Sequence, residues 1–240
     1  MTRTVLITRH ADDCDELAAL LEPHGLTVEP YPVLRVEAVD DASGWTAAAA
    51  ASGAGRPTWV MMASPRAAAR FVEHCRQRDL DALLDAPVAV IGDGTAAAAR
   101  AAGLEPSLVG PGTGLGLAAD LKAVLTEPTT VLFPCGEHRR SELPDALRAA
   151  GHDVVPVVVY RMAETPIDQL PIIHRAPAAV VVTSPRSARL YLEAIGGTPL
   201  PCPHWALGPT TRDAADELGL ACSIPTEPTL ESLAEDLCRN

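Results

Sequence analysis

The chain has 240 residues, of which 48% are hydrophobic and 21% charged. This is the composition of a globular protein with one large or two smaller domains, and it excludes a disordered, collagen-like or coiled-coil chain. A formal net charge of −12 argues against nucleic-acid binding, because phosphate recognition rests on a basic surface. No apolar run approaches the roughly 18 residues of a membrane helix, and no signal-peptide core follows the first residues. We therefore expect a cytoplasmic protein without a membrane or nucleic-acid partner.

The first segment has the pattern of a strand, a helix and a second strand. Residues 5–7 form an apolar run of strand length, and Leu17, Leu20 and Leu21 follow at helical spacing. Gly25 is expected to end this helix, with an extended segment after it.

Two further strand-to-helix units follow in the first half. Residues 58–62 predict a strand ahead of Ser64 and Pro65, which suit the N-cap and the first position of a helix. Residues 88–91 predict another strand, followed by an alanine-rich helix that ends at Gly103. Both units predict a helix that begins directly at the end of a strand.

Neither glycine cluster is a nucleotide-binding motif. Residues 92–94 begin like a dinucleotide fingerprint, but Ala97 stands where the third glycine is needed. Residues 110–116 are glycine-rich but lack the lysine of a phosphate-binding loop. We expect a flexible loop there, ahead of a helix over 117–125, and a loop lid over the binding cleft is the alternative.

The second half of the chain repeats the first. Three segment pairs align in the same order: 5–35 on 131–161, 60–71 on 180–191, and 90–107 on 206–223. Because strands alternate with helices, we predict two similar open α/β domains with mainly parallel sheets, produced by internal duplication. In such sheets ligands bind beyond the carboxyl ends of the strands.

A small or hydroxyl residue recurs where a strand end opens a helix, often beside an arginine. The instances are Thr8-Arg9, Ser64-Pro65-Arg66, Gly92-Asp93-Gly94-Thr95, Cys135-Gly136, Ser184-Pro185-Arg186 and Gly208-Pro209-Thr210-Thr211. Any one of them is explained by helix capping alone. Their recurrence at corresponding edges of duplicated domains favours a shared site for anions, because helix N-termini carry unsatisfied N–H groups and a positive dipole end.

Tyr160 is the most informative aromatic residue. It stands where the other copy has Leu34, so the repeated fold does not require an aromatic side chain there. A core tyrosine in a strand and a functional tyrosine both remain open. His10 and His138 follow the first strands of the paired segments, and we expect polar surface roles for them. The histidines and the six cysteines show no metal-ligand spacing, and Cys135 is a weak candidate for a reactive thiol.

Taken in order, several short motifs resemble the uroporphyrinogen-III synthase family. They are Val-Leu-Ile-Thr-Arg at 5–9, Ala-Ser-Pro-Arg-Ala at 63–67, Val-Ile-Gly at 90–92 with Thr95-Ala96, Val-Leu-Phe at 131–133 with Gly136 and Arg140, Val-Tyr-Arg at 159–161, Val-Thr-Ser-Pro at 182–185 and Leu-Gly-Pro-Thr-Thr at 207–211. The resemblance spans essentially the whole chain. The sequence departs from the family pattern at His10, where a proline is common, and at Asp93-Gly94.

The resemblance implies a bilobed molecule in which the two halves exchange their first segments. Residues 1–36 and 165–240 are then expected in one lobe and 37–164 in the other, joined by a pair of strands near 33–39 and 159–164. It also implies a monomeric enzyme that uses neither a metal nor an organic cofactor. Its substrate is the linear tetrapyrrole hydroxymethylbilane, received from hydroxymethylbilane synthase, and its product is uroporphyrinogen III, formed with loss of water and inversion of ring D.

This substrate carries eight carboxylates, so an acidic chain must attract it locally and not through its overall field. We expect Tyr160 to assist departure of the substrate hydroxyl. The expected binding residues are Thr8, Arg9, Ser64, Arg66, Thr95, Gly136, Arg139, Arg140, Ser184, Arg186, Thr210 and Thr211. Two alternatives are a non-catalytic tetrapyrrole or anion sensor on the same fold, and an unrelated bilobed transferase, which the missing nucleotide motif disfavours.

Overall fold

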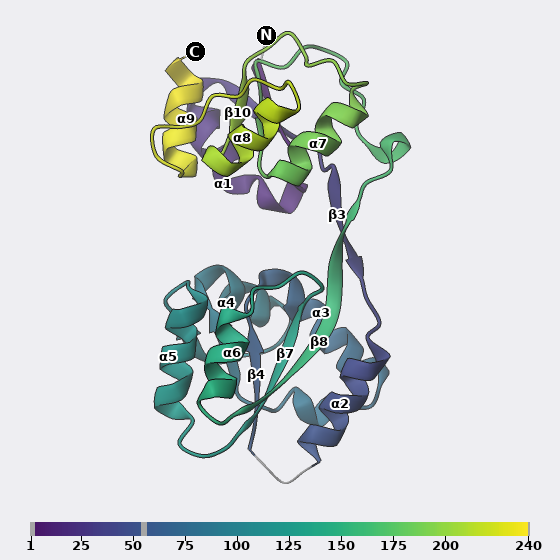
Figure 1. Cartoon of the computed structure of the whole chain (residues 1–240), viewed down its shortest axis with the longest axis vertical. Coiled ribbons are helices and arrows are strands. Elements are labelled where there is room, and N and C mark those ends of the chain that lie inside the picture. The colour runs from purple at the N-terminus through teal and green to yellow at the C-terminus, as the bar shows by residue number, and fades with distance from the viewer. Residues whose placement is uncertain (1–2, 54–56, 240) are drawn as a thin grey trace. The chain divides into compact units, whose positions relative to one another are not determined.

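A computed structural model of the chain, which describes residues 3–53 and 57–239, divides into two compact units. Unit 1 consists of Met1–Arg35 and Ala163–Asn240, and unit 2 is Val36–Met162. Each unit is a sheet with helices on both faces (Figure 1). The pairings among β1, β2, β9 and β10 and among β4, β5, β6, β7 and β8 are parallel, which confirms the predicted fold class of two similar open α/β domains with mainly parallel sheets.

Unit 1 contains a four-stranded sheet in the order β10-β9-β1-β2. Its elements are β1 (Arg3–Ile7), α1 (Asp15–Leu21), β2 (Leu26–Pro30), β9 (Ala179–Val182), α7 (Pro185–Ala194), β10 (His204–Ala206), α8 (Pro209–Glu217) and α9 (Leu230–Arg239). Helices α1 and α9 pack on one face of this sheet, against Val5 and Ile7, and α7 and α8 pack on the other, against Leu6. Burial on both faces explains why all four residues of β9 are apolar and buried.

Unit 2 contains a six-stranded sheet in the order β3-β8-β7-β4-β5-β6. Its elements are β3 (Leu34–Ala38), α2 (Ala42–Ser52), β4 (Thr58–Met62), α3 (Pro65–Gln77), β5 (Val88–Ile91), α4 (Gly92–Ala101), β6 (Pro106–Gly110), α5 (Gly114–Val124), β7 (Thr130–Gly136), α6 (Glu142–Ala149) and β8 (Asp153–Glu164). Helices α2, α3 and α4 pack on one face of the sheet, against Val60 and Met62. Helices α5 and α6 pack on the other face, against Met61, and lie side by side in Figure 1.

The two sheets repeat one strand order and exchange their first segments. In unit 1, β2-β1-β9-β10 is the same succession as β8-β7-β4-β5 in unit 2, in agreement with the aligned sequence pairs. Strand β1 pairs with β9, and β7 pairs with β4, so each sheet joins the first segment of one repeat to the later strands of the other.

One expected boundary was wrong, in the glycine-rich segment. The helix expected over 117–125 is α5, and it begins one turn earlier, at Gly114. Thr113 is its N-cap and accepts a hydrogen bond from the Gly116 N–H at 3.1 Å. The loop between β6 and α5 is therefore only residues 111–113. Short 3₁₀ helices occur at Ala11–Asp13, Glu22–His24, Asp81–Leu83 and Ile167–Gln169. Among the described residues, no helix is long and apolar enough to cross a membrane.

Candidate active site

Unit 2 has a cavity of about 380 Å³ at the carboxyl ends of its parallel strands. Strands β5, β7 and β8 contribute to it, together with the turn between β4 and α3, the loop before α5 and the segment between β7 and α6. This is the edge at which open α/β sheets bind ligands. Five predicted site residues line the cavity: Ser64, Gly136, Arg139, Arg140 and Tyr160.

Tyr160 lies across the end of β7. The register between β7 and β8 is regular up to Cys135 and then shifts, so that Gly136 pairs with Tyr160. The Glu137 N–H donates to the Tyr160 carbonyl at 2.9 Å and fixes this pairing. A Cβ on Gly136 would lie 2.8 Å from Cζ and 3.0 Å from Oη of Tyr160. The half-buried phenol therefore rests directly on a glycine and lines the cavity, and Tyr160 also packs against the apolar core beneath α2, α3 and α4.

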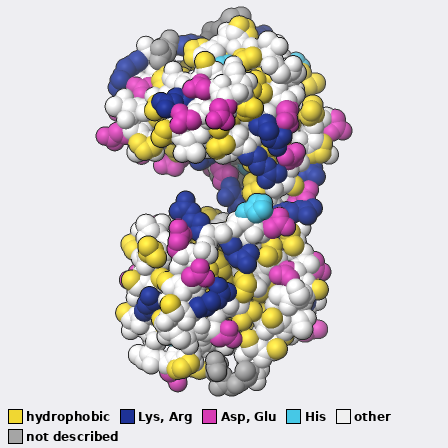
Figure 2. Space-filling view, in the orientation of Figure 1, with side chains coloured by type: hydrophobic (Ala, Val, Ile, Leu, Met, Phe, Trp, Pro, Cys, Tyr) yellow, Lys and Arg dark blue, Asp and Glu magenta, His cyan; other side chains and the backbone are white. Residues whose placement is uncertain are grey.

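Two arginines follow β7 at the same cavity. Arg139 donates to the Glu137 carbonyl at 3.4 Å, and Arg140 has no ion pair among the described residues. Glu142 is the one acidic residue in the lining. Over the face shown in Figure 2, basic and acidic side chains are interspersed and no broad basic surface forms. Attraction of an anionic ligand to this cavity must therefore be local.

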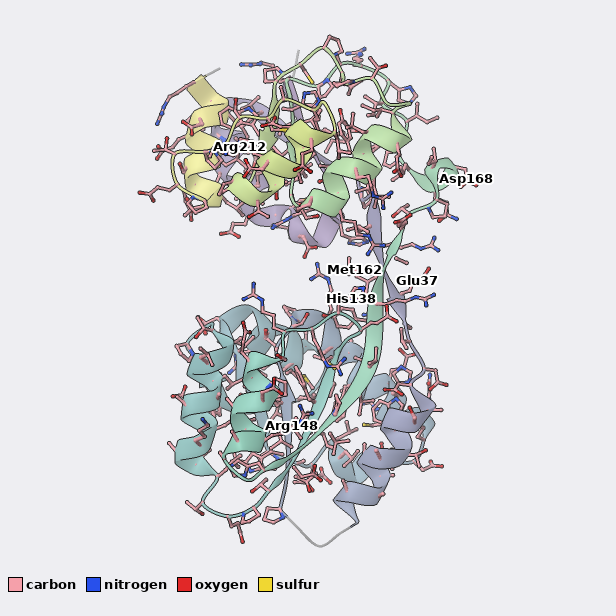
Figure 3. All side chains as sticks on the ribbon, viewed as in Figure 1. Glu37, His138, Arg148, Met162, Asp168 and Arg212 are labelled. Carbon is pink, nitrogen blue, oxygen red and sulfur yellow. The ribbon has the colours of Figure 1, made fainter. Side chains whose placement is uncertain are left out.

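Cys135 lines the cavity but is not a reactive thiolate. Its side chain is 3% exposed, and Sγ lies 3.6 Å from the Val157 carbonyl oxygen. Burial raises the pKa of Cys135 to about 11, so the thiol stays protonated at neutral pH. His138 also lines the cavity and is exposed at the strand-end edge of unit 2 (Figure 3).

The start of α3 has the predicted capping geometry. Ser64 Oγ accepts the Arg66 N–H at 3.3 Å, and Pro65 is the first helical residue. Ser64 lies in the cavity lining, whereas Arg66 does not. Thr95 is 2% exposed within α4 and is also outside the lining. The binding roles of Arg66 and Thr95 stay predictions.

Glycines 92 and 112 let the loop before α5 reach the cavity. Gly92 has φ +67°, and a Cβ there would lie 3.3 Å from the Gly112 Cα. The close backbone approach brings residues 112–114 into the lining. The sequence left a loop over the cleft as an alternative for 110–116 but did not single out these residues, because the contact depends on how the loop docks against α4. It also missed Ala63, Ile91, Phe133, Pro134, Glu142 and Leu143.

The corresponding edge of unit 1 carries a network of hydroxyl groups. Thr8 Oγ1 donates to Ser187 Oγ at 3.1 Å and accepts the Thr183 N–H at 3.2 Å. Ser184 and Ser187 form a capping box at the start of α7. Thr8 is 4% exposed, so its hydroxyl joins β1 to the β9–α7 turn. Ser187, which the sequence analysis did not single out, is the centre of this network.

The remaining predicted residues of unit 1 lie at the starts of helices or strand ends. Arg186, on the first turn of α7, pairs with Glu164 at 3.4 Å, and hydrogen bonds from Arg189 and Arg186 lower the pKa of Glu164. Thr210 is exposed and Thr211 is 7% exposed on the first turn of α8, whose N-cap is a glycine without a side-chain acceptor. Arg9 is half-buried after β1. Their binding roles, like that of Ser184, stay predictions.

No cluster of three or more metal-ligating side chains occurs in the part of the chain that the structure describes. The cysteines in that part are free, and three of them, Cys14, Cys75 and Cys135, are buried.

The fold and the cavity define a two-unit α/β protein with hydroxyl-capped helix starts and local arginines at its strand ends. The chain belongs to the uroporphyrinogen-III synthase HemD family, whose model matches residues 15–235. A crystal structure of a mutant uroporphyrinogen III synthase from Thermus thermophilus is 20% identical, covers 99% of this chain and 98% of that one, and gives a TM-score of 0.55. Uroporphyrinogen-III synthetase from Helicobacter pylori is 16% identical over 99% of this chain and 98% of that one, with a TM-score of 0.63. At these identities the two structures show the shared fold. Comparison with curated protein sequences gives no significant match.

Proposed function

We propose that this chain is a cyclising lyase that converts hydroxymethylbilane to uroporphyrinogen III, with loss of water and inversion of ring D. Membership of the uroporphyrinogen-III synthase family supports the reaction. The observation that carries the site assignment is the placement of the Tyr160 phenol in one strand-end cavity with Arg139 and Arg140.

The chemistry requires departure of a hydroxyl group, which leaves poorly unless it receives a proton or a strong hydrogen bond. In the proposed step the C–O bond breaks, and the electron pair of the neighbouring pyrrole nitrogen stabilises the electron-deficient carbon that is left. The Tyr160 O–H donates its proton to the leaving oxygen, which departs as water. Ring D then attacks through its substituted carbon to give a spiro intermediate, and the older bond from that carbon to the methylene bridge of ring C breaks. The free α-carbon of ring D bonds to this methylene carbon and loses its proton, which restores the Tyr160 phenol and closes the inverted macrocycle. The net change is loss of one water.

The arginines bind and orient the substrate carboxylates in this proposal. Arg140 is exposed at the cavity and free of ion pairs among the described residues, so its guanidinium is available for a carboxylate. Arg139 lies beside it, with a single hydrogen bond to a backbone carbonyl. Binding by arginines and backbone N–H groups is compatible with a chain of formal charge −12, because charges beyond about 8 Å are screened at physiological ionic strength.

The decisive experiment is product analysis with hydroxymethylbilane generated enzymatically in the assay. The purified chain is added at catalytic amounts, and the uroporphyrinogen isomers are oxidised and separated. Isomer III in excess, rising with protein concentration, supports the proposal. Isomer I alone, the product of uncatalysed closure, overturns it.

The sensor alternative has no observation in its favour. It would require tetrapyrrole binding without turnover, which the same assay detects as isomer I formed in the presence of bound ligand. We extend the proposal to a monomer in the cytoplasm that takes hydroxymethylbilane from its synthase. Sedimentation and co-purification test these two points separately from the reaction.

A further inference from the structure

The carboxylate of Asp41 joins two segments that are 117 residues apart in the sequence. As the N-cap of α2, its Oδ1 accepts the Gly44 N–H at 2.9 Å and the Ser43 hydroxyl at 2.8 Å. Its Oδ2 accepts the Val158 N–H of β8 at 3.1 Å. One oxygen therefore caps a helix, and the other holds a strand.

Val158, the residue of β8 that donates to Asp41, lies just before the register shift at Tyr160. Val158 pairs with Cys135, and the register shifts directly afterwards so that Tyr160 pairs with Gly136. On the other side of β8, β3 ends at Ala38, and the Val39 N–H donates to the Val159 carbonyl at 3.2 Å. Asp41 Oδ2 supplies the acceptor for Val158 at the place where β3 has ended.

Both oxygens of Asp41 are acceptors at neutral pH. Burial alone would raise the pKa of this carboxyl, but hydrogen bonds from Gly44, Val158 and Ser43 and the nearby Arg139 together lower it. The packing leaves no room for a side chain at residue 44, since a Cβ on Gly44 would collide with Oδ2. The position of the Asp41 carboxylate therefore depends on glycine at residue 44.

We propose that Asp41 is a positioning residue for Tyr160: by accepting the Val158 N–H, its carboxylate holds β8 in the register that sets the phenol over Gly136 at the cavity. The proposal rests on the proposed function for its effect on rate, but its structural part is independent of that function. Asp41 itself does not line the cavity, so it acts through β8 and not on the substrate.

Two substitutions separate the strand contact from the helix cap. Asp41→Asn keeps one acceptor oxygen and replaces the other with an N–H₂ donor, so it cannot serve both α2 and Val158. Asp41→Ser keeps a favourable N-cap for α2 but is too short to reach β8. Asp40→Asn is the matched control, because it removes a charge from the adjacent residue, whose exposed carboxylate pairs with Arg78.

Fluorotyrosine incorporation gives a readout of position that does not depend on activity. The chain has three tyrosines, and Tyr31 and Tyr191 lie in unit 1 with ring centroids 6.2 Å apart. Their ¹⁹F resonances serve as internal references, and the Tyr160 resonance is assigned by its loss in Tyr160→Phe. A local change on β8 shifts the Tyr160 signal alone, whereas general unfolding shifts all three.

In Asp41→Asn and Asp41→Ser, we expect the Tyr160 resonance to move while the two references stay in place. We expect kcat to fall about tenfold with KM changed less than twofold, because displacement of a reacting group by about 1 Å can cost up to 10²-fold in rate. Asp40→Asn should match the wild type in both measurements.

The proposal is overturned if the Tyr160 resonance stays in place in both Asp41 variants. It is also overturned if the resonance moves but kcat does not, in a protein whose Tyr160→Phe variant is slow. If Tyr160→Phe itself keeps the wild-type rate, the proposed role of Tyr160 fails, while the resonance still decides whether Asp41 sets its position.

Discussion

Alanine in place of Gly136 tests whether the phenol of Tyr160 must rest on the end of β7. Gly136 is not among the glycines with positive φ, so its backbone accepts a side chain without strain. The consequence of the substitution is therefore the collision of the new methyl group with the tyrosine ring. The three atoms nearest to the new methyl group all belong to that ring and its hydroxyl.

The size of the displacement follows from the distances. The new Cβ would lie 2.8 Å from Cζ and 2.9 Å from Cε2 of Tyr160, whereas carbon atoms in ordinary contact are about 3.5 to 4.0 Å apart. The ring must retreat by roughly 0.7 Å or more. Such overpacking costs about 1 to 3 kcal/mol of stability, and a misplaced catalytic group costs up to about 10² in rate. We expect kcat to fall about 10- to 100-fold, with KM changed much less.

The assay measures uroporphyrinogen III formation by Gly136→Ala, Tyr160→Phe and the double variant. If the methyl group of Gly136→Ala slows the reaction only by displacing the Tyr160 hydroxyl, it can have no further effect once that hydroxyl is absent. The double variant should then be no slower than Tyr160→Phe. Gly94→Ala is the control, because a Cβ there meets nothing within 4 Å and the residue lies in α4 of the same unit.

Two results would refute the reasoning about Gly136. A folded Gly136→Ala protein with the wild-type kcat would show that the ring position is unimportant for turnover. Losses that multiply in the double variant would show that the methyl group harms the site by some route other than the Tyr160 hydroxyl.

Three other changes test separate parts of the structure. Tyr160→Phe should lower single-turnover rate about 10²-fold, the low end of the range for a positioned acid; the wild-type rate in the folded variant would contradict a chemical role, and loss of folding would indicate a core role. Arg140→Ala should weaken product binding about tenfold in titration calorimetry, near the value of one charge-assisted hydrogen bond, and complete loss of binding would point to a single dominant clamp. Burial raises the pKa of Cys75 to about 12 and of Cys135 to about 11, above an ordinary value of 9.0, so folded thiols hold their protons where unfolded ones ionise. The free energy of unfolding should therefore fall as pH rises from 9 towards 11, and the urea midpoint measures this fall. Cys75→Ala should make the urea midpoint less dependent on pH. An unchanged pH dependence in that variant would contradict the contribution of Cys75.

The duplication made much of the fold predictable from the sequence. Repeated strand-turn-helix segments predicted two similar, mainly parallel sheets but left open which first segment completes which sheet, and Ser64 and Pro65 predicted the start of α3 correctly. Helix α2 was not predicted, because its alanine-rich sequence carries no stripe of large apolar residues. It is held instead by Trp45, which is 3% exposed and stacks on Phe71 with ring centroids 6.1 Å apart.

The candidate site was predictable only in part, because the sequence identifies strand ends but not how their backbones meet. Gly136 and Tyr160 could each be named from their motifs, yet the register shift that stacks one on the other depends on hydrogen bonds between distant segments. Asp41 shows the limit most clearly. Aspartate is a favoured N-cap residue, a role that uses one carboxylate oxygen, and nothing in the local pattern indicates that the second oxygen binds Val158. A residue that positions a functional group through the backbone of another strand leaves no local motif, so it has to be found from the hydrogen bonds of the folded chain.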